Sequence, residues 1–305
     1  MIFNANKSEL KQWAMLLKNG ILLSALAYFS NLYLIRHYSD YDYGSLAEIN
    51  IYATLFLLFV VYETDSIAQK LLYEQNQDIS SIICTISSVR IINFIITSAF
   101  IVIYSIYSNN IKYTSIIVFL LPAFNASYIY ETSKNNHGYS YIYLIEKIIY
   151  TIIIIVCIKL KLNIINSAVV STLIATFMSL YYQYTSVFRR HVLIYKIVRS
   201  DILKTYKANL RILVNAYAMF AFGNFSKLLL GFKVGLSALG SYSFCWQVVS
   251  LATLLNSIVQ KVYRNDFHKI ISERKINELK ILIKRLCFKS ILIMLIFNTV
   301  LYFLS

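Results

Sequence analysis

Hydrophobic residues form long, nearly continuous stretches of the chain, and charged residues fall mainly between them. The runs Leu55–Tyr62 and Ile148–Ile158 are almost wholly apolar and lack the strict alternation of a barrel strand. A helix needs about 20 apolar residues to cross a hydrocarbon core about 30 Å thick. The pattern therefore predicts nine transmembrane helices, near residues 15–35, 45–62, 82–107, 111–130, 139–158, 164–187, 210–232, 238–259 and 281–304.

Composition supports an all-α polytopic membrane protein. Of the 305 residues, 58% are hydrophobic and only 14% are charged, and the mean hydropathy is +0.61. These values lie outside the range of soluble domains. One proline and seven glycines leave few places for tight hairpins or phosphate-binding loops. The four cysteines are scattered, with no C-x-x-C pair and no histidine at ligand spacing, so we expect no metal and no cofactor.

The distribution of Lys and Arg predicts the orientation of the chain. Of the 29 basic residues, 21 lie at the N-terminus or around the connections that follow the second, fourth, sixth and eighth predicted helices. Five lie on the opposite side and three lie inside the helices. The positive-inside rule then places the N-terminus in the cytoplasm. Cytoplasmic loops beside anionic lipids explain the net charge of +15, so nucleic acid is not an expected partner.

A short repeat indicates two halves of similar orientation. Residues 65–70 (DSIAQK) close the second predicted helix, residues 256–261 (NSIVQK) close the eighth, and four of the six positions are identical. Glycine turns precede both helices, at Gly44 and Gly240, whereas an ungapped offset of 191 pairs Gly44 with Gly235. The pattern favours a parallel repeat over chance similarity between apolar segments. The expected units are a six-helix lobe at 1–188, a cytoplasmic linker at 189–209 and a partial three-helix lobe at 210–305.

Four segments are similar to those of a known transporter family. They are the turns Tyr43–Ser45 and Gly240–Tyr242, the basic connection Arg189–Arg211 and the amphipathic stretch Phe267–Lys280 before the ninth helix. Together they resemble the polysaccharide transporter branch of the multidrug/oligosaccharidyl-lipid/polysaccharide (MOP) flippase superfamily, most of all O-antigen flippases of the Wzx type. Members usually have twelve or fourteen helices, so the chain looks truncated after its ninth helix.

The resemblance implies a transporter and not an enzyme. Its substrate would be an undecaprenyl-pyrophosphate-linked oligosaccharide, such as an O-antigen repeat unit, carried by alternating access across the bacterial cytoplasmic (inner) membrane. The implied partners are this lipid-linked oligosaccharide, membrane lipids and other polysaccharide assembly proteins. A charge at the bilayer centre costs at least about 3 kcal/mol. A hydrated cavity between two lobes removes that barrier while the prenyl tail stays in lipid.

Basic residues inside the predicted helices are candidate headgroup-binding residues, because such charges must face a cavity or a partner. Lys147 lies far from either end of the fifth helix and is expected to contact an anionic headgroup, with a structural ion pair as the alternative. Lys227 lies near the outer end of the seventh helix, where snorkelling is the alternative. Arg211 begins the same helix on the cytoplasmic side. Arg90 lies at the foot of the third helix.

Acidic residues are candidates for ion coupling, because a carboxylate in a low-dielectric cavity can take up and release a proton. The candidates are Glu48, inside the second helix, and Glu146, beside Lys147. Asp65 is interpreted as a cap at the membrane boundary, and Pro122 is expected to kink the fourth helix. Two other functions stay open: a cation-coupled multidrug-type exporter of the same fold, and a membrane polysaccharide polymerase or glycosyltransferase.

Overall fold

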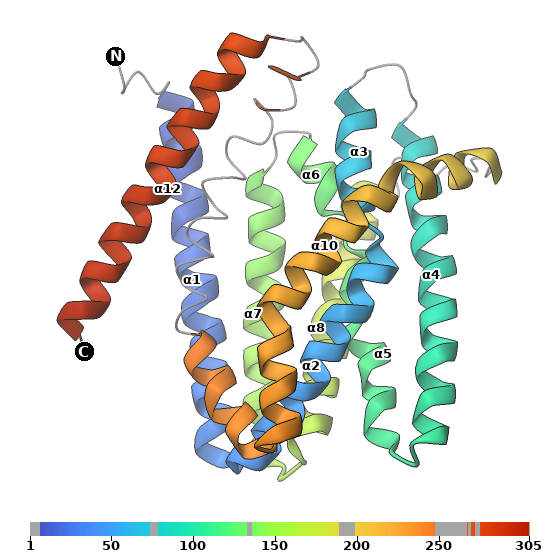
Figure 1. The fold of residues 1–305 in the computed structure, drawn as a ribbon, viewed down its shortest axis with the longest axis vertical. Helices are drawn as coiled ribbons and strands as arrows, with labels where there is room; N and C mark the ends of the chain where they lie inside the picture. Colours follow the sequence, from blue (N-terminus) through green and yellow to red (C-terminus); the bar gives the residue numbers. More distant parts are fainter. Residues whose placement is uncertain are drawn as a thin grey trace.

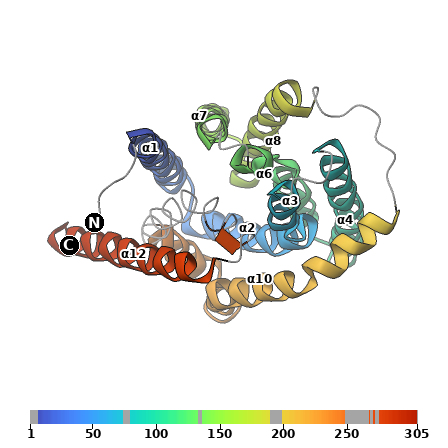
Figure 2. The same cartoon turned by 90° about the horizontal axis from the view of Figure 1, so that it is seen from above.

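The computed structural model describes residues 7–73, 79–132, 136–188, 199–247, 267, 270–271 and 275–304. Within these ranges the chain is helical and contains no strand. Figure 1 shows the helices standing side by side, and Figure 2 shows α2 between α10 on one side and α7 and α8 on the other.

The elements are α1 (Lys7–His37), α2 (Asp40–Val61), α3 (Thr64–Tyr73), α4 (Ile79–Tyr107), η1 (Ile111–Ser115), α5 (Ile116–Phe119), η2 (Leu121–Phe124), α6 (Ser127–Thr132), α7 (Asn136–Lys159), α8 (Ile164–Gln183), η3 (Tyr184–Phe188), α10 (Arg199–Lys233), a helix at 236–247 and α12 (Ile276–Leu304).

Six helical segments within the described ranges are long and apolar enough to cross a membrane. They are Asp40–Gln69, Ser80–Tyr107, Ile111–Tyr130, Tyr141–Lys159, Ile164–Ser186 and Asp201–Lys233. These segments match the second to seventh predicted spans and confirm a multi-pass, all-α protein. The first and ninth predicted spans lie within α1 and α12, and the eighth begins in the helix at 236–247. Residues 248–259 of the eighth lie outside the described residues, so nine spans stay a prediction.

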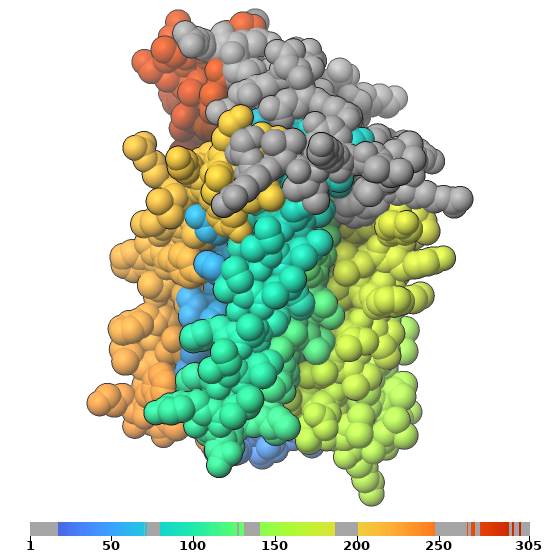
Figure 3. Space-filling view, turned by 90° about the vertical axis from the view of Figure 1, so that its right-hand side faces the viewer, coloured from blue at the N-terminus to red at the C-terminus, as the bar shows by residue number. Residues whose placement is uncertain are grey.

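The connection between the two predicted lobes contains the start of a long helix. Residues 199–209, which the sequence assigned to a linker, form the first turns of α10 and continue without interruption into the seventh predicted span. α10 contacts α2, α3 and α4. Figure 3 shows α4 on the face of the bundle between α10 and α8. The first half of α10 is therefore part of the packed bundle.

The fourth predicted span is broken and not simply kinked. η1, α5, η2 and α6 follow one another between Ile111 and Thr132, and Pro122 lies in the first turn of η2. Proline supplies no backbone N–H, so the helical hydrogen-bond pattern is lost around it. Asn125 then adopts extended backbone angles (φ −63°, ψ 136°) and ends η2. The break leaves backbone polar groups inside an apolar bundle.

Two buried side chains bind the backbone groups at this break. Arg90 of α4 donates from Nη1 to the carbonyl oxygens of Ala123 and Asn125, at 2.6 and 2.9 Å. Gln183 of α8 accepts the Ala126 N–H through Oε1 at 2.7 Å. The exposed fractions of Arg90 and Gln183 are 3% and 0%. Lipid offers no hydrogen bonds, so side chains of the bundle must replace the missing helical partners.

Arg90 also joins α4 to α3. Its Nε donates to Thr64 Oγ1 at 2.9 Å, and its Nη2 forms an ion pair with Asp65 Oδ1 at 2.6 Å. The Tyr128 ring centre lies 5.5 Å from the guanidinium carbon. Four of the five guanidinium N–H groups are thus bonded within the bundle. Asp65, interpreted from the sequence as a boundary cap, is the counterion of a buried arginine.

Two helix pairs of the chain have the same layout. α1 ends at His37 and α2 begins at Asp40, while α10 ends at Lys233 and the next helix begins at residue 236. The two connections coincide at an offset of 196 residues. At this offset residues 29–34 (FSNLYL) match residues 225–230 (FSKLLL) at four of six positions, and Gly44 matches Gly240. The earlier match at 256–261 lies outside the described residues.

The two equivalent glycines lie against each other's helices. A Cβ atom on Gly44 would overlap the carbonyl oxygen of Leu236, and one on Gly240 would overlap the carbonyl oxygen of Asp40. Asp40 and Leu236 are themselves related by the offset of 196 residues. The contact is therefore reciprocal, as between two copies related by a two-fold axis. Backbones this close leave no room for a side chain, which explains glycine at both positions.

Replacing Arg90 with methionine is expected to lower the free energy of unfolding by about 3–5 kcal/mol, because Asp65 and two backbone carbonyls lose their partner in a buried site. Thermal unfolding of the purified protein in detergent measures the effect. Lys204→Met is the control, because Lys204 pairs with Asp201 but is 78% exposed, and loss of such a pair changes stability by at most about 1 kcal/mol. Equal melting temperatures for the two variants would contradict the assignment.

Candidate functional site

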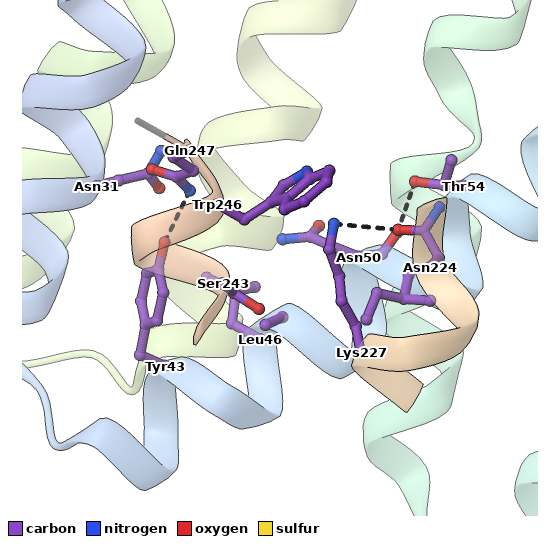
Figure 4. Close-up of a pocket in the computed structure, with 12 residues that line it drawn as sticks. Asn31, Tyr43, Leu46, Asn50, Thr54, Asn224, Lys227, Ser243, Trp246 and Gln247 are labelled. Carbon is purple, nitrogen blue, oxygen red and sulfur yellow. Dashed lines mark hydrogen bonds between the residues drawn. The ribbon is translucent and has the colours of Figure 1, made fainter. Parts of the chain in front are cut away.

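A cavity of about 190 Å³ lies between α1, α2, α10 and the helix at 236–247. Figure 4 shows its side chains converging from these helices. Amide, hydroxyl and aromatic groups make up most of its wall. The lining residues are Asn31, Tyr43, Leu46, Ala47, Asn50, Ile51, Thr54, Asn224, Lys227, Ser243, Trp246 and Gln247.

The cavity lies across equivalent parts of the two matching helix pairs. The close contact between Gly44 and Gly240 lies beside the cavity wall: Gly44 directly follows the lining residue Tyr43, and Gly240 comes three residues before the lining residue Ser243. Both helix pairs therefore contribute corresponding positions to one site. Four pairs of lining residues are related by the offset of 196: Asn31 and Lys227, Ala47 and Ser243, Asn50 and Trp246, and Ile51 and Gln247.

Trp246 stands between two polar parts of the cavity (Figure 4). On one side, Gln247 Nε2 donates to the Tyr43 hydroxyl oxygen at 2.8 Å. This bond joins α2 directly to the helix at 236–247. On the other side, Lys227 Nζ donates to Asn224 Oδ1 at 3.3 Å. The cavity thus has a neutral hydrogen-bonding part and a cationic part, separated by an indole ring.

Lys227 supplies a positive charge that the described lining does not neutralise. Its Nζ lies 4.7 Å from the centre of the Trp246 ring, and the side chain is half-buried. No Asp or Glu is among the lining residues that the structure describes. An aromatic face and one amide oxygen compensate only part of the desolvation of an ammonium group. The geometry therefore favours an anionic ligand.

The size of the cavity limits which part of a ligand fits. Pockets that enclose a drug-sized molecule usually measure about 300–1,000 Å³, and this cavity is smaller, at about 190 Å³. In this conformation it suits a small anionic group and not a whole oligosaccharide. Within the described ranges, no three His, Cys, Asp or Glu side chains gather closely enough to hold a metal ion.

Lys147 and Glu146, adjacent on α7, face different neighbours. Lys147 Nζ lies 4.3 Å from the centre of the Tyr150 ring. Tyr150 packs on the core cluster that contains Tyr43, so one aromatic ring links Lys147 to the cavity wall. The Glu146 carboxylate lies near the Ser179 hydroxyl of α8. A headgroup contact for Lys147 and ion coupling by Glu146 stay predictions.

Three other predicted site residues, Arg90, Glu48 and Arg211, do not line the cavity. Arg90 is inside the junction of α3 and α4, and Glu48 forms an ion pair with Lys112 of η1 at 3.0 Å. Arg211 is exposed on α10. Of the six candidates, the structure places Lys227 in the cavity wall itself. The roles assigned to Arg90, Glu48 and Arg211 stay predictions.

Sequence reasoning missed most of the polar wall. It selected ionisable residues, whereas Asn50, Trp246 and Gln247 are neutral. The offset of 196, carried by the match between residues 29–34 and 225–230, would have paired these positions. No protein-family model, curated protein or solved structure matches the chain. Fold and site together define a multi-pass helical membrane protein with a polar cavity that carries a positive charge.

Replacing Gly44 with alanine is expected to lower the free energy of unfolding by about 1–3 kcal/mol, because the new methyl group overlaps backbone atoms of the opposite helix. The same substitution should make a cysteine at Ser243 in the cavity react faster with a water-soluble maleimide. Gly223→Ala on α10 is the control, because nothing lies within 4 Å of its added Cβ. Unchanged stability and labelling in Gly44→Ala would show that the glycine contact does not hold the helices together.

Proposed function

We propose that the protein moves an undecaprenyl-pyrophosphate-linked oligosaccharide across the bacterial cytoplasmic (inner) membrane. The proposal is carried by the half-buried Lys227 in a cavity whose described lining includes amides and hydroxyls but no carboxylate. An ammonium group is a suitable partner for phosphate oxygens, and amides and hydroxyls suit sugar hydroxyls. Transport of this kind needs no covalent step, so the site requires no catalytic residue.

The proposed transporter has two lobes of similar orientation around this cavity, with nine spans and a cytoplasmic N-terminus. The reciprocal contact of Gly44 and Gly240 and the matching connections at an offset of 196 support this arrangement. The excess of basic residues on one side supports the orientation. In that orientation the glycine contact closes the outer end of the cavity, and rocking of the lobes would open it.

Positive charges along α10 suggest a route for the headgroup. Arg211 is exposed, and Lys227 lies 16 residues later on the same helix, which corresponds to roughly 24 Å along the helix axis. In the proposed mechanism Arg211 meets the pyrophosphate near the cytoplasmic surface and Lys227 binds it inside the cavity. The prenyl chain remains in lipid throughout, because its transfer into a polar cavity would be unfavourable.

A cation-coupled exporter would require a carboxylate in the cavity. The described lining contains none, and the acidic candidate Glu48 is paired with Lys112. A polymerase or glycosyltransferase would require an acidic catalytic loop or a large external loop. The longest outer connection expected from the sequence is about ten residues by the span prediction. Lipid-linked sugar transport therefore agrees best with the site.

Lys227→Gln is expected to slow transport by about tenfold or more, because a hydrogen bond to a charged group contributes about 1.5–3 kcal/mol. Proteoliposomes would carry a fluorescent undecaprenyl-pyrophosphate oligosaccharide, and the loss of fluorescence to an impermeant reductant would report its movement between leaflets. Lys233→Gln, an exposed lysine at the end of the same helix, is the control. Transport by Lys227→Gln at the wild-type rate would show that the cavity is not the headgroup-binding site. Absence of transport by the wild-type protein would contradict the proposed function.

A further inference from the structure

One face of α1 is covered by α7. Residues spaced by three or four positions form this face, as expected for a buried helical stripe. Ser30 Oγ lies 2.8 Å from Thr151 Oγ1 of α7, and Leu34 packs in one cluster with Ile154. The α1 stripe consists of Asn19, Leu23, Leu26, Ser30 and Leu34, of which Asn19, Ser30 and Leu34 are 5%, 1% and 0% exposed.

The equivalent stripe of α10 has similar residues, but four of the five are exposed and the fifth, Leu230, is half-buried. Three of its five positions are identical to those of the α1 stripe: asparagine, serine and leucine at the first, fourth and fifth. Met219 and Phe222 are 67% and 89% exposed, and Asn215 and Ser226 are also exposed. The α10 stripe consists of Asn215, Met219, Phe222, Ser226 and Leu230.

The whole span to which this stripe belongs is unusually exposed. Only 6% of the most apolar window of α10 is buried, compared with 22–39% for the other five candidate spans. α10 does contact α2, α3 and α4, but it does so through other positions, such as Thr205, Asn209 and Leu213. The α10 stripe therefore faces away from the helices that the structure describes.

The composition of the α10 stripe is that of a helix interface. An asparagine and a serine lie within an otherwise apolar face, and lipid offers no hydrogen-bond partner to either side chain. Small and polar residues are enriched where membrane helices pack together, and serine and asparagine bond across such contacts. Ser30 shows this use in the equivalent position, through its bond to Thr151. A purely lipid-facing surface would not need this pattern.

We propose that the α10 stripe docks a transmembrane helix with the chemistry of α7. The docked helix runs parallel to α10, because α7 runs parallel to α1. Ser30 of α1 meets Thr151 of α7, and Tyr38, directly after α1, donates to the carbonyl oxygen of Leu162, shortly after α7. It presents a hydroxyl group opposite Ser226 and a branched aliphatic side chain opposite Leu230. This interaction is separate from the proposed function and does not depend on the transported substrate.

The chain itself provides a probe for this docking site. A synthetic peptide of residues 139–160, with Thr151→Cys and Cys157→Ala, reproduces α7. The receptor is the full chain in liposomes, with its four native cysteines replaced and Ser226→Cys introduced. Mild oxidation should form a disulfide between the peptide and the receptor. The yield should exceed that of a receptor with Phe225→Cys by about tenfold, because the adjacent residue points about 100° away around the helix.

Ser30→Cys is the second control, because the receptor's own α7 covers that position. It should give no more disulfide than Phe225→Cys. Equal yields at positions 226 and 225 would show that the α10 stripe is an ordinary lipid-facing surface and would overturn the proposal. A disulfide between two receptors at Ser226→Cys in the absence of peptide would overturn it as well, because a second copy of the chain would then cover the stripe.

Discussion

The direct backbone contact between Gly44 and Gly240 determines how the two matching helix pairs meet. Without side chains between them, the starts of α2 and of the helix at 236–247 lie close enough for Gln247 to bond Tyr43 across the junction. The reciprocal geometry then brings corresponding positions, including Asn31 and Lys227, to one cavity. A larger residue at either glycine would separate the helices and change the site as well as the packing.

Two basic residues of the bundle differ in how far their surroundings neutralise the charge, and this difference distinguishes a structural role from a binding role. Four of the five guanidinium N–H groups of Arg90 are bonded: Asp65 neutralises its charge, and Thr64 and the carbonyls released at the Pro122 break accept its other hydrogen bonds. Lys227 has one amide oxygen and an indole face, and the described cavity wall adds no carboxylate. The first arrangement stabilises the fold. The second leaves electrostatic attraction available for a ligand.

The spans were predictable because the length of an apolar run is a local property, and six of them agree with the structure. The extent of the break at Pro122 could not be predicted from the sequence, because it depends on Arg90 and Gln183, which come from other helices. Charge alone did not separate Lys227 from Arg90, whose counterion is 25 residues away in the chain. The neutral lining residues depend on how the two helix pairs align, and the six-residue repeat at an offset of 191 gave a different register from the structural offset of 196.

The central claim is that the Lys227 ammonium group faces a cavity that accepts an anionic lipid headgroup. The most direct measurement is the rate at which an amine-specific reagent modifies Lys227, followed by peptide mass spectrometry of the protein in proteoliposomes. Undecaprenyl pyrophosphate should slow this modification severalfold, whereas the uncharged alcohol undecaprenol should not, and exposed Lys233 should react equally in both cases. Equal modification of Lys227 with both lipids would contradict the account.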